Sequence, residues 1–147
     1  MEAIKCILQL RSLADFYEAA CKPVCHKRKL SQTALDILMF LAANPECDTA
    51  KDISKYRGIK ASMVSFNVER LVEEGYLERH EVPGDRRKIR LVCTGKAAGL
   101  VREGEQAAEE FYRAILEGMK EEDIDRFERD MALLCHNARQ LKRDPHI

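Results

Sequence analysis

Residues 58–97 read GIKASMVSFNVERLVEEGYLERHEVPGDRRKIRLVCTGKA, and this stretch decides the fold. From Lys60 onward, apolar residues recur at three- and four-residue spacings, which predicts a helix with one buried face that stops at Gly75. Two runs of alternating polarity follow, YLERHEV and KIRLVC, and each predicts a β-strand. The connection Val82-Pro83-Gly84-Asp85 has Pro second and Gly third, as in a type II turn. The stretch therefore predicts a helix followed by a β-hairpin.

A second, shorter helix is expected just before this one. Thr49 and Asp52 resemble a capping box that opens a helix through Tyr56, and Gly58 ends it. Two helices joined by a short turn that contains glycine make a helix-turn-helix candidate.

Long helices are predicted on both sides. Residues 2 to about 22 form one helix, which Pro23 is expected to end or kink. Ser31 caps a helix that closes at Asn44-Pro45. Thr94 caps a stretch with helical spacing over 97–119, and another helix follows the break GMKEED. The order is α-α-α-α-β-β-α-α, a mainly α fold.

Composition places the chain among globular proteins of one domain. Its 147 residues carry 25 basic and 25 acidic side chains, but 27–96 holds 14 basic and 10 acidic, a net +4. This local excess hints at a polyanionic partner. No apolar run approaches the roughly 18 residues of a membrane span, and no leader is apparent. We therefore expect a soluble cytoplasmic protein with no membrane partner, whose six cysteines are reduced thiols.

The order of these elements, and the motif Asp-x-Arg at Asp85 and Arg87, resemble the MarR family of bacterial transcription regulators. The resemblance implies a single MarR-like chain over 1–147, with a winged helix DNA-binding lobe at 28–96 and helical dimerisation regions at 1–27 and 97–147. It further implies a homodimer that binds double-stranded DNA at a pseudo-palindromic operator. The expected function is a repressor relieved by a small-molecule inducer bound between the dimerisation helices and the lobe.

The residues suggest which side chains would contact DNA. If Val64 centres the buried face of its helix, a turn of about 100° per residue puts Ser62 and Phe66 on the opposite side, with Met63 and Ser65 beside them. That face would enter the major groove, although Phe66 departs from the polar residues common in the family and could instead pack on the domain surface. The candidate DNA-contacting residues are Lys60, Ser62, Met63, Ser65, Phe66, Arg86, Arg87, Lys88 and Arg90.

The cations of the hairpin have separate expected roles. Arg86 and Arg87 at its tip would enter the minor groove. Lys88 and Arg90, on the outward strand face, would contact phosphates. Asp85 would pair with or orient Arg87 and so shape the tip.

Other classes of function are less well supported. No phosphate loop and no metalloprotease motif occurs, so we expect neither an enzyme nor a cofactor. One alternative is a thiol- or metal-responsive regulator that uses Cys21, Cys25 and His26, which supply at most three ligands. Another is a winged helix adaptor that contacts proteins. Cys93 and Cys135 are expected to be small buried hydrophobes.

Overall fold

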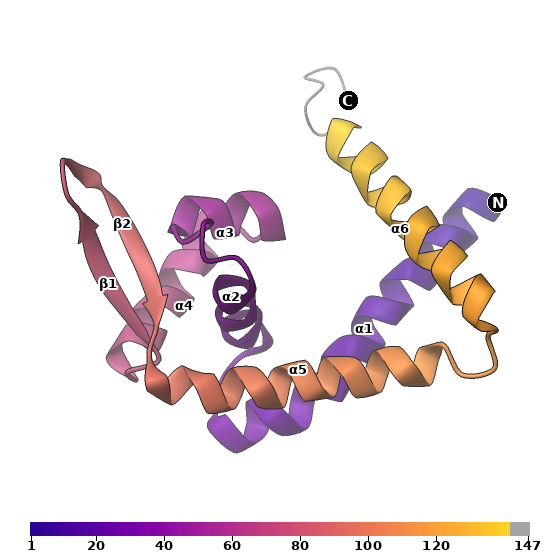
Figure 1. The fold of residues 1–147 in the computed structure, drawn as a ribbon, viewed down its shortest axis with the longest axis horizontal. Helices are drawn as coiled ribbons and strands as arrows, with labels where there is room; N and C mark the ends of the chain where they lie inside the picture. The colour runs from indigo at the N-terminus through magenta and orange to yellow at the C-terminus, as the bar shows by residue number, and fades with distance from the viewer. Residues whose placement is uncertain (142–147) are drawn as a thin grey trace. The chain divides into compact units, whose positions relative to one another are not determined.

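The computed structural model describes residues 1–141 and contains six helices and one two-stranded sheet (Figure 1). The elements in chain order are α1 (Glu2–Arg28), α2 (Gln32–Ala43), α3 (Ala50–Arg57), α4 (Ala61–Glu73), β1 (Leu77–Val82), β2 (Asp85–Cys93), α5 (Gly95–Ile115) and α6 (Glu121–Leu141). The predicted mainly α fold and its element order are confirmed. The chain divides into two compact units, Met1–Phe111 and Tyr112 onward, and the boundary falls inside α5.

The core of the first unit is built around α2. Its buried face contacts α1, α3, α4 and β2, and the start of α5 adds Ala97 and Leu100 to the same core. Large aliphatic side chains that are almost completely buried come from five elements: Leu35, Ile37, Leu38, Ile53, Val64, Leu71, Leu77 and Leu100. Burial of each such side chain contributes about 1.5–3 kcal/mol, so this core fixes the helix-turn-helix and the base of the hairpin as one body.

Local signals in the sequence explain where the elements begin and end. The Ser31 hydroxyl accepts a hydrogen bond from the Ala34 amide, and the Thr49–Asp52 capping box is complete in both directions. Gly58 takes a left-handed conformation with φ of 65° at the end of α3. Gly84, with φ of 85°, supplies the positive angle that the third position of a type II turn requires.

The hairpin is antiparallel, and only its base is buried. Leu77 pairs with Cys93 and Val82 pairs with Asp85, so Pro83 and Gly84 form a two-residue connection. Leu77 and Leu91 are buried, whereas residues from Asp85 to Arg90 are exposed. The tip therefore extends beyond the helices as a wing, as Figure 1 shows.

The predicted end of the first helix near residue 22 is wrong, and the Thr94 side chain forms a bond that was not predicted. Pro23 lies inside α1, which continues to Arg28. A proline removes only one backbone donor, and Pro23 sits on the exposed side where water can satisfy the freed carbonyl. Thr94 directly precedes α5, as predicted, but its hydroxyl donates to the Gly75 carbonyl at 2.6 Å, in the turn that follows α4.

The first part of α5 packs closely on α1 and α2. A Cβ atom on Gly104 would lie 2.8 Å from Met39 Sδ and 3.0 Å from Leu35 Cδ1, so glycine permits this approach. Glu103 accepts hydrogen bonds from Arg28 and Lys27 of α1, and the Arg28 guanidinium lowers the pKa of the Glu103 carboxyl. Tyr17 and Phe111 meet edge to face, with ring centroids 5.7 Å apart.

The second unit consists of the end of α5 and α6. Tyr112 donates to a Glu128 carboxylate oxygen at 2.7 Å, and this bond raises the pKa of Tyr112. Cys135 is exposed, so the prediction that it is buried is wrong for the single chain. None of the helices within residues 1–141 combines the length and the apolar character that crossing a membrane requires.

Candidate nucleic-acid interface

The outer face of α4 presents the side chains that the helical projection predicted. Ser62, Met63, Ser65 and Phe66 are all exposed, whereas Val64 and Val68 on the opposite face are buried. Phe66 is 59% exposed, so it does not pack onto the domain surface. Lys60, which precedes the first turn, is exposed as well. An apolar ring between hydroxyls is a surface suited to a thymine methyl and its neighbouring base edges.

A buried amide fixes the position of this helix. Asn67 is 4% exposed, and its Oδ1 accepts a hydrogen bond from the Ser31 hydroxyl at 2.8 Å while its Nδ2 donates to the Met63 carbonyl. Ser31 also caps α2, so one hydroxyl joins the start of α2 to the middle of α4. The sequence offered only a weak signal for this role, a polar residue at a position where helical spacing expects an apolar one.

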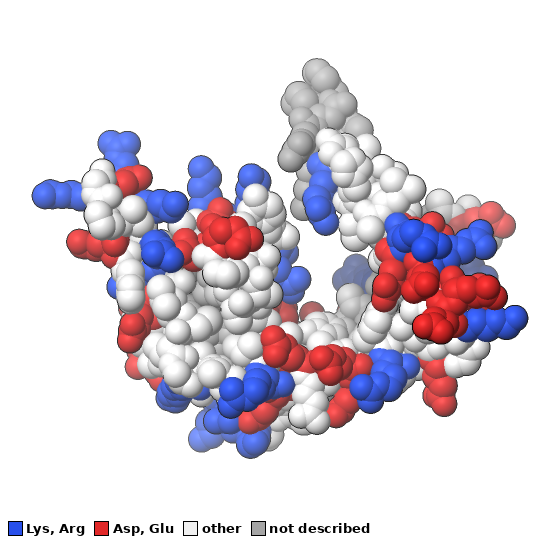
Figure 2. Space-filling model, in the orientation of Figure 1, with Lys and Arg blue, Asp and Glu red and all other residues white. Residues whose placement is uncertain are grey.

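At the wing tip, the Asp85 side chain forms a hydrogen bond with the backbone of Arg87. Its Oδ1 accepts a hydrogen bond from the Arg87 amide at 3.0 Å, so it shapes the tip without pairing with the Arg87 guanidinium. Within the described chain, Arg86, Arg87 and Lys88 form no ion pair. Figure 2 shows blue side chains at the free end of the hairpin and, on the same side of the unit, over α3.

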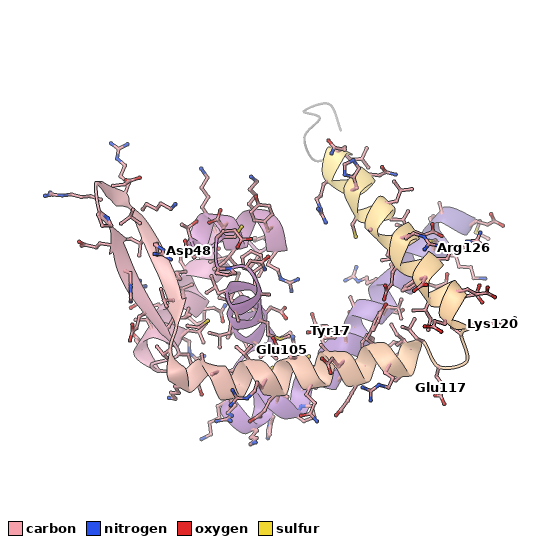
Figure 3. The ribbon with its side chains drawn as sticks, in the orientation of Figure 1. Tyr17, Asp48, Glu105, Glu117, Lys120 and Arg126 are labelled. Atoms are coloured by element: carbon pink, nitrogen blue, oxygen red, sulfur yellow. The ribbon has the colours of Figure 1, made fainter. Side chains whose placement is uncertain are left out.

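Arg90 behaves differently from the tip cations. Its Nε donates to Asp48 Oδ2 at 2.6 Å, and the Asp48 side chain is only 10% exposed. The Leu91 amide also donates to the Asp48 carbonyl at 2.7 Å. Figure 3 places Asp48 between β2 and the helices. Asp48 therefore ties the base of the wing to the loop between α2 and α3, a role that the sequence did not reveal.

The paired arginines lie away from the wing tip and the start of α3. Arg79 of β1 pairs with Glu69 of α4 at 2.7 Å, and Arg57 at the end of α3 pairs with Asp36 of α2 at 3.2 Å. Arg70 of α4 pairs with Glu74, the residue that follows the last residue of α4. These acidic partners neutralise the flanks of the unit, whereas the tip keeps its positive charge.

The cysteine cluster lacks the features of a reactive or metal-binding site. Cys21 and Cys25 are buried, and burial is the main cause that raises the pKa of the Cys25 thiol, which keeps it protonated at neutral pH. Its Sγ lies 3.8 Å from Gln32 Oε1, while His26 is exposed. Within residues 1–141, no three His, Cys, Asp or Glu side chains are placed to hold a metal ion.

Comparison with known proteins agrees with this geometry. Residues 29–88 match the sequence model of the MarR family. A MarR transcriptional regulator from Methanosarcina mazei has a similar structure, with a TM-score of 0.83 and 18% identity over 96% of this chain and 99% of that one.

Two further structures are similar. For apo MarR from E. coli the TM-score is 0.69 at 13% identity, with 86% of this chain and 93% of that one covered. BpsR of Bordetella bronchiseptica, whose DNA binding is regulated by 6-hydroxynicotinic acid, matches with a TM-score of 0.65 at 24% identity. The match covers 84% of this chain and 90% of that one.

Proposed function

Because this chain has the MarR sequence signature over residues 29–88 and the fold of MarR transcription regulators, we propose that it binds specific DNA sequences as a transcription regulator. In this proposal α4 enters the major groove with Ser62, Met63, Ser65 and Phe66, and Lys60 contacts the adjoining phosphate. The wing places Arg86 and Arg87 in the neighbouring minor groove. The protein would act in the cytoplasm and would have no catalytic activity.

One observation carries the proposal: the unpaired cations of the wing tip lie on a projecting hairpin next to an exposed recognition face. An exposed charge run is usually no more than a solvated surface. Here Arg57, Arg70, Arg79 and Arg90 are matched by acidic partners, whereas the tip cations are not. A duplex supplies the missing negative charge along its backbone.

We also propose that the protein acts as a homodimer. Apolar side chains between the start and the middle of α1 are exposed, with Ile4 at 65%, Ile7 at 64% and Phe16 at 65%. On α6, Leu133 and Leu134 are 58% and 55% exposed. Contiguous apolar helix faces of this kind mark an interaction surface. Sedimentation at micromolar concentration should give about twice the chain mass of 16.9 kDa, and a monomer would contradict the proposal.

We further propose that a small-molecule inducer relieves repression by this protein. A cavity of about 620 Å³ lies against α1 and the start of α2, lined by Glu18, Lys22, His26 and Gln32 among others. Its volume falls within the roughly 300–1,000 Å³ of small-molecule sites. The regulation of BpsR by 6-hydroxynicotinic acid supports a small organic effector for this chain too.

The test of DNA binding compares the parent with Arg87→Ala on duplex DNA. Loss of one minor-groove contact should weaken binding by roughly 1–3 kcal/mol for each subunit, with the unfolding midpoint unchanged because Arg87 is exposed. Equal affinity of the two proteins would favour the adaptor alternative, in which the wing contacts a protein.

A further inference from the structure

A cleft of about 570 Å³ separates the start of α3 from the wing. Residues 49–52 line one side, and Asp85, Arg87, Lys88 and Ile89 line the other. Both walls belong to the first compact unit, so their relative position is fixed by the same core. None of the exposed α4 residues Ser62, Met63, Ser65 and Phe66 lines this cleft.

Charge in this cleft is not balanced by its own acids. Asp52 accepts hydrogen bonds from the amide and the hydroxyl of Thr49, which completes the cap of α3. Asp85 accepts from the Arg87 amide. Both carboxylates are thus engaged in shaping their own segments. In the described part of the chain, Lys51, Arg87 and Lys88 have no acidic partner.

Resting on the function proposed above, we infer that this cleft seats a phosphate of the DNA backbone, and that Lys51 is a phosphate-binding residue. Lys51 lines one wall of the cleft and Lys88 lines the other, so a phosphodiester seated in the cleft would have a cation on each side. Lys51 is exposed and comes from the first helix of the helix-turn-helix, whereas Lys88 is exposed on β2 and remains free for the backbone when Arg87 enters the minor groove. A phosphate held between them would fix the register of the wing on the duplex without reading sequence.

Two variants test this seat by independent means. Lys51→Gln removes one cation while keeping a long polar side chain. Ala50→Tyr leaves the charge unchanged but fills the cleft, and Ala50 is exposed at the start of α3, so the fold should tolerate the ring. Lys120→Gln, in the second unit, is the matched control for loss of one lysine. Urea unfolding of each variant checks that the fold is intact.

The measurement is the affinity for a 30-base-pair duplex of mixed sequence across a series of NaCl concentrations. For a dimer, Lys51→Gln should make the slope of log K against log [NaCl] shallower by about 1.8, which is about 0.9 for each of two lost phosphate contacts. Ala50→Tyr should lower affinity at every salt concentration, and Lys120→Gln should match the parent. Parental slopes and affinities in both cleft variants would overturn the inference.

Two other outcomes separate this inference from its premises. If the parent binds no duplex at all, the proposed function fails and the seat fails with it. If inorganic phosphate binds the parent but not Lys51→Gln, while duplex affinity and salt slope are the same in the parent and both cleft variants, the cleft holds a free anion rather than the backbone. That result would contradict the DNA phosphate while leaving DNA binding itself intact.

Discussion

Asp48→Asn should destabilise the protein more than any other loss of one negative charge near the wing. The substitution keeps the size of the side chain but removes the charge that holds Arg90 Nε at 2.6 Å. The backbone bond from the Leu91 amide to the Asp48 carbonyl is untouched, so the variant isolates the side-chain contribution.

The size of this loss in the free energy of unfolding follows from the burial of the two side chains. A hydrogen bond to a charged group contributes about 1.5–3 kcal/mol, and the Asp48 side chain is largely shielded from water at 10% exposure. Arg90 is 51% exposed, so solvent screens part of the attraction and the contribution falls to the low end of that range or slightly below it. We expect Asp48→Asn to lower the free energy of unfolding by about 1–2 kcal/mol.

Urea unfolding of Asp48→Asn, Arg90→Gln and the double variant measures the interaction directly. The coupling energy from this cycle should be about 1 kcal/mol. Glu81→Gln is the control, because Glu81 is an exposed carboxylate of β1. A coupling energy below about 0.3 kcal/mol would show that Asp48 does not tie the wing to the body.

Three further predictions follow from packing and burial. Gly104→Val should lower the free energy of unfolding by about 1–3 kcal/mol, because Leu35 and Met39 leave no room for a side chain there. Gly99→Ala is the control and should be neutral or slightly stabilising, since a Cβ atom at Gly99 would meet only Arg102 Nη2 at 4.0 Å. Equal urea midpoints for the two variants would refute the close packing of α5 at Gly104. Asn67→Ala should lower the free energy of unfolding by about 1–3 kcal/mol and reduce DNA affinity, because the buried amide joins α4 to Ser31. Urea denaturation and titration with duplex DNA measure the two effects, and an unchanged urea midpoint would show that Asn67 does not hold α4 in place. Iodoacetamide at pH 8 should leave Cys21 and Cys25 unlabelled until urea is added, because both are buried and the pKa of Cys25 is raised. Mass spectrometry locates the label, and rapid labelling of either cysteine in the native protein would favour the thiol-sensing alternative.

Most of the fold could be predicted because its signals are local. Capping at Ser31 and Thr49, positive φ at Gly58 and Gly84, and the alternation that buries Leu91 each depend on a few neighbouring residues. Pro23 misled the prediction, since the cost of one missing donor on an exposed helix side is smaller than the gain from continuing the helix. The exposed face of α4 was also predictable, because 3.6-residue periodicity fixes which side chains oppose the core.

The contacts that position the site could not be predicted. Asp48 and Arg90 are 42 residues apart, and Ser31 and Asn67 are 36 apart, so only the folded chain brings each pair together. Thr94 and Gly75 are 19 residues apart, so neighbouring residues give no signal for the hydrogen bond between them either. The cleft beside Lys51 has the same origin, because its walls come from α3 and β2.

The central claim is that α4 and the wing read DNA sequence, and selection from a random duplex library tests it most directly. Purified protein should enrich an inverted repeat whose half-sites lie about one helical turn, roughly 10 base pairs, apart, as two-fold symmetric helix-turn-helix proteins require. Arg87→Ala should enrich the same repeat with less preference in the flanking A·T-rich positions. Sequencing that shows no enriched motif for the parent after repeated rounds, although it is folded and dimeric, would contradict the account.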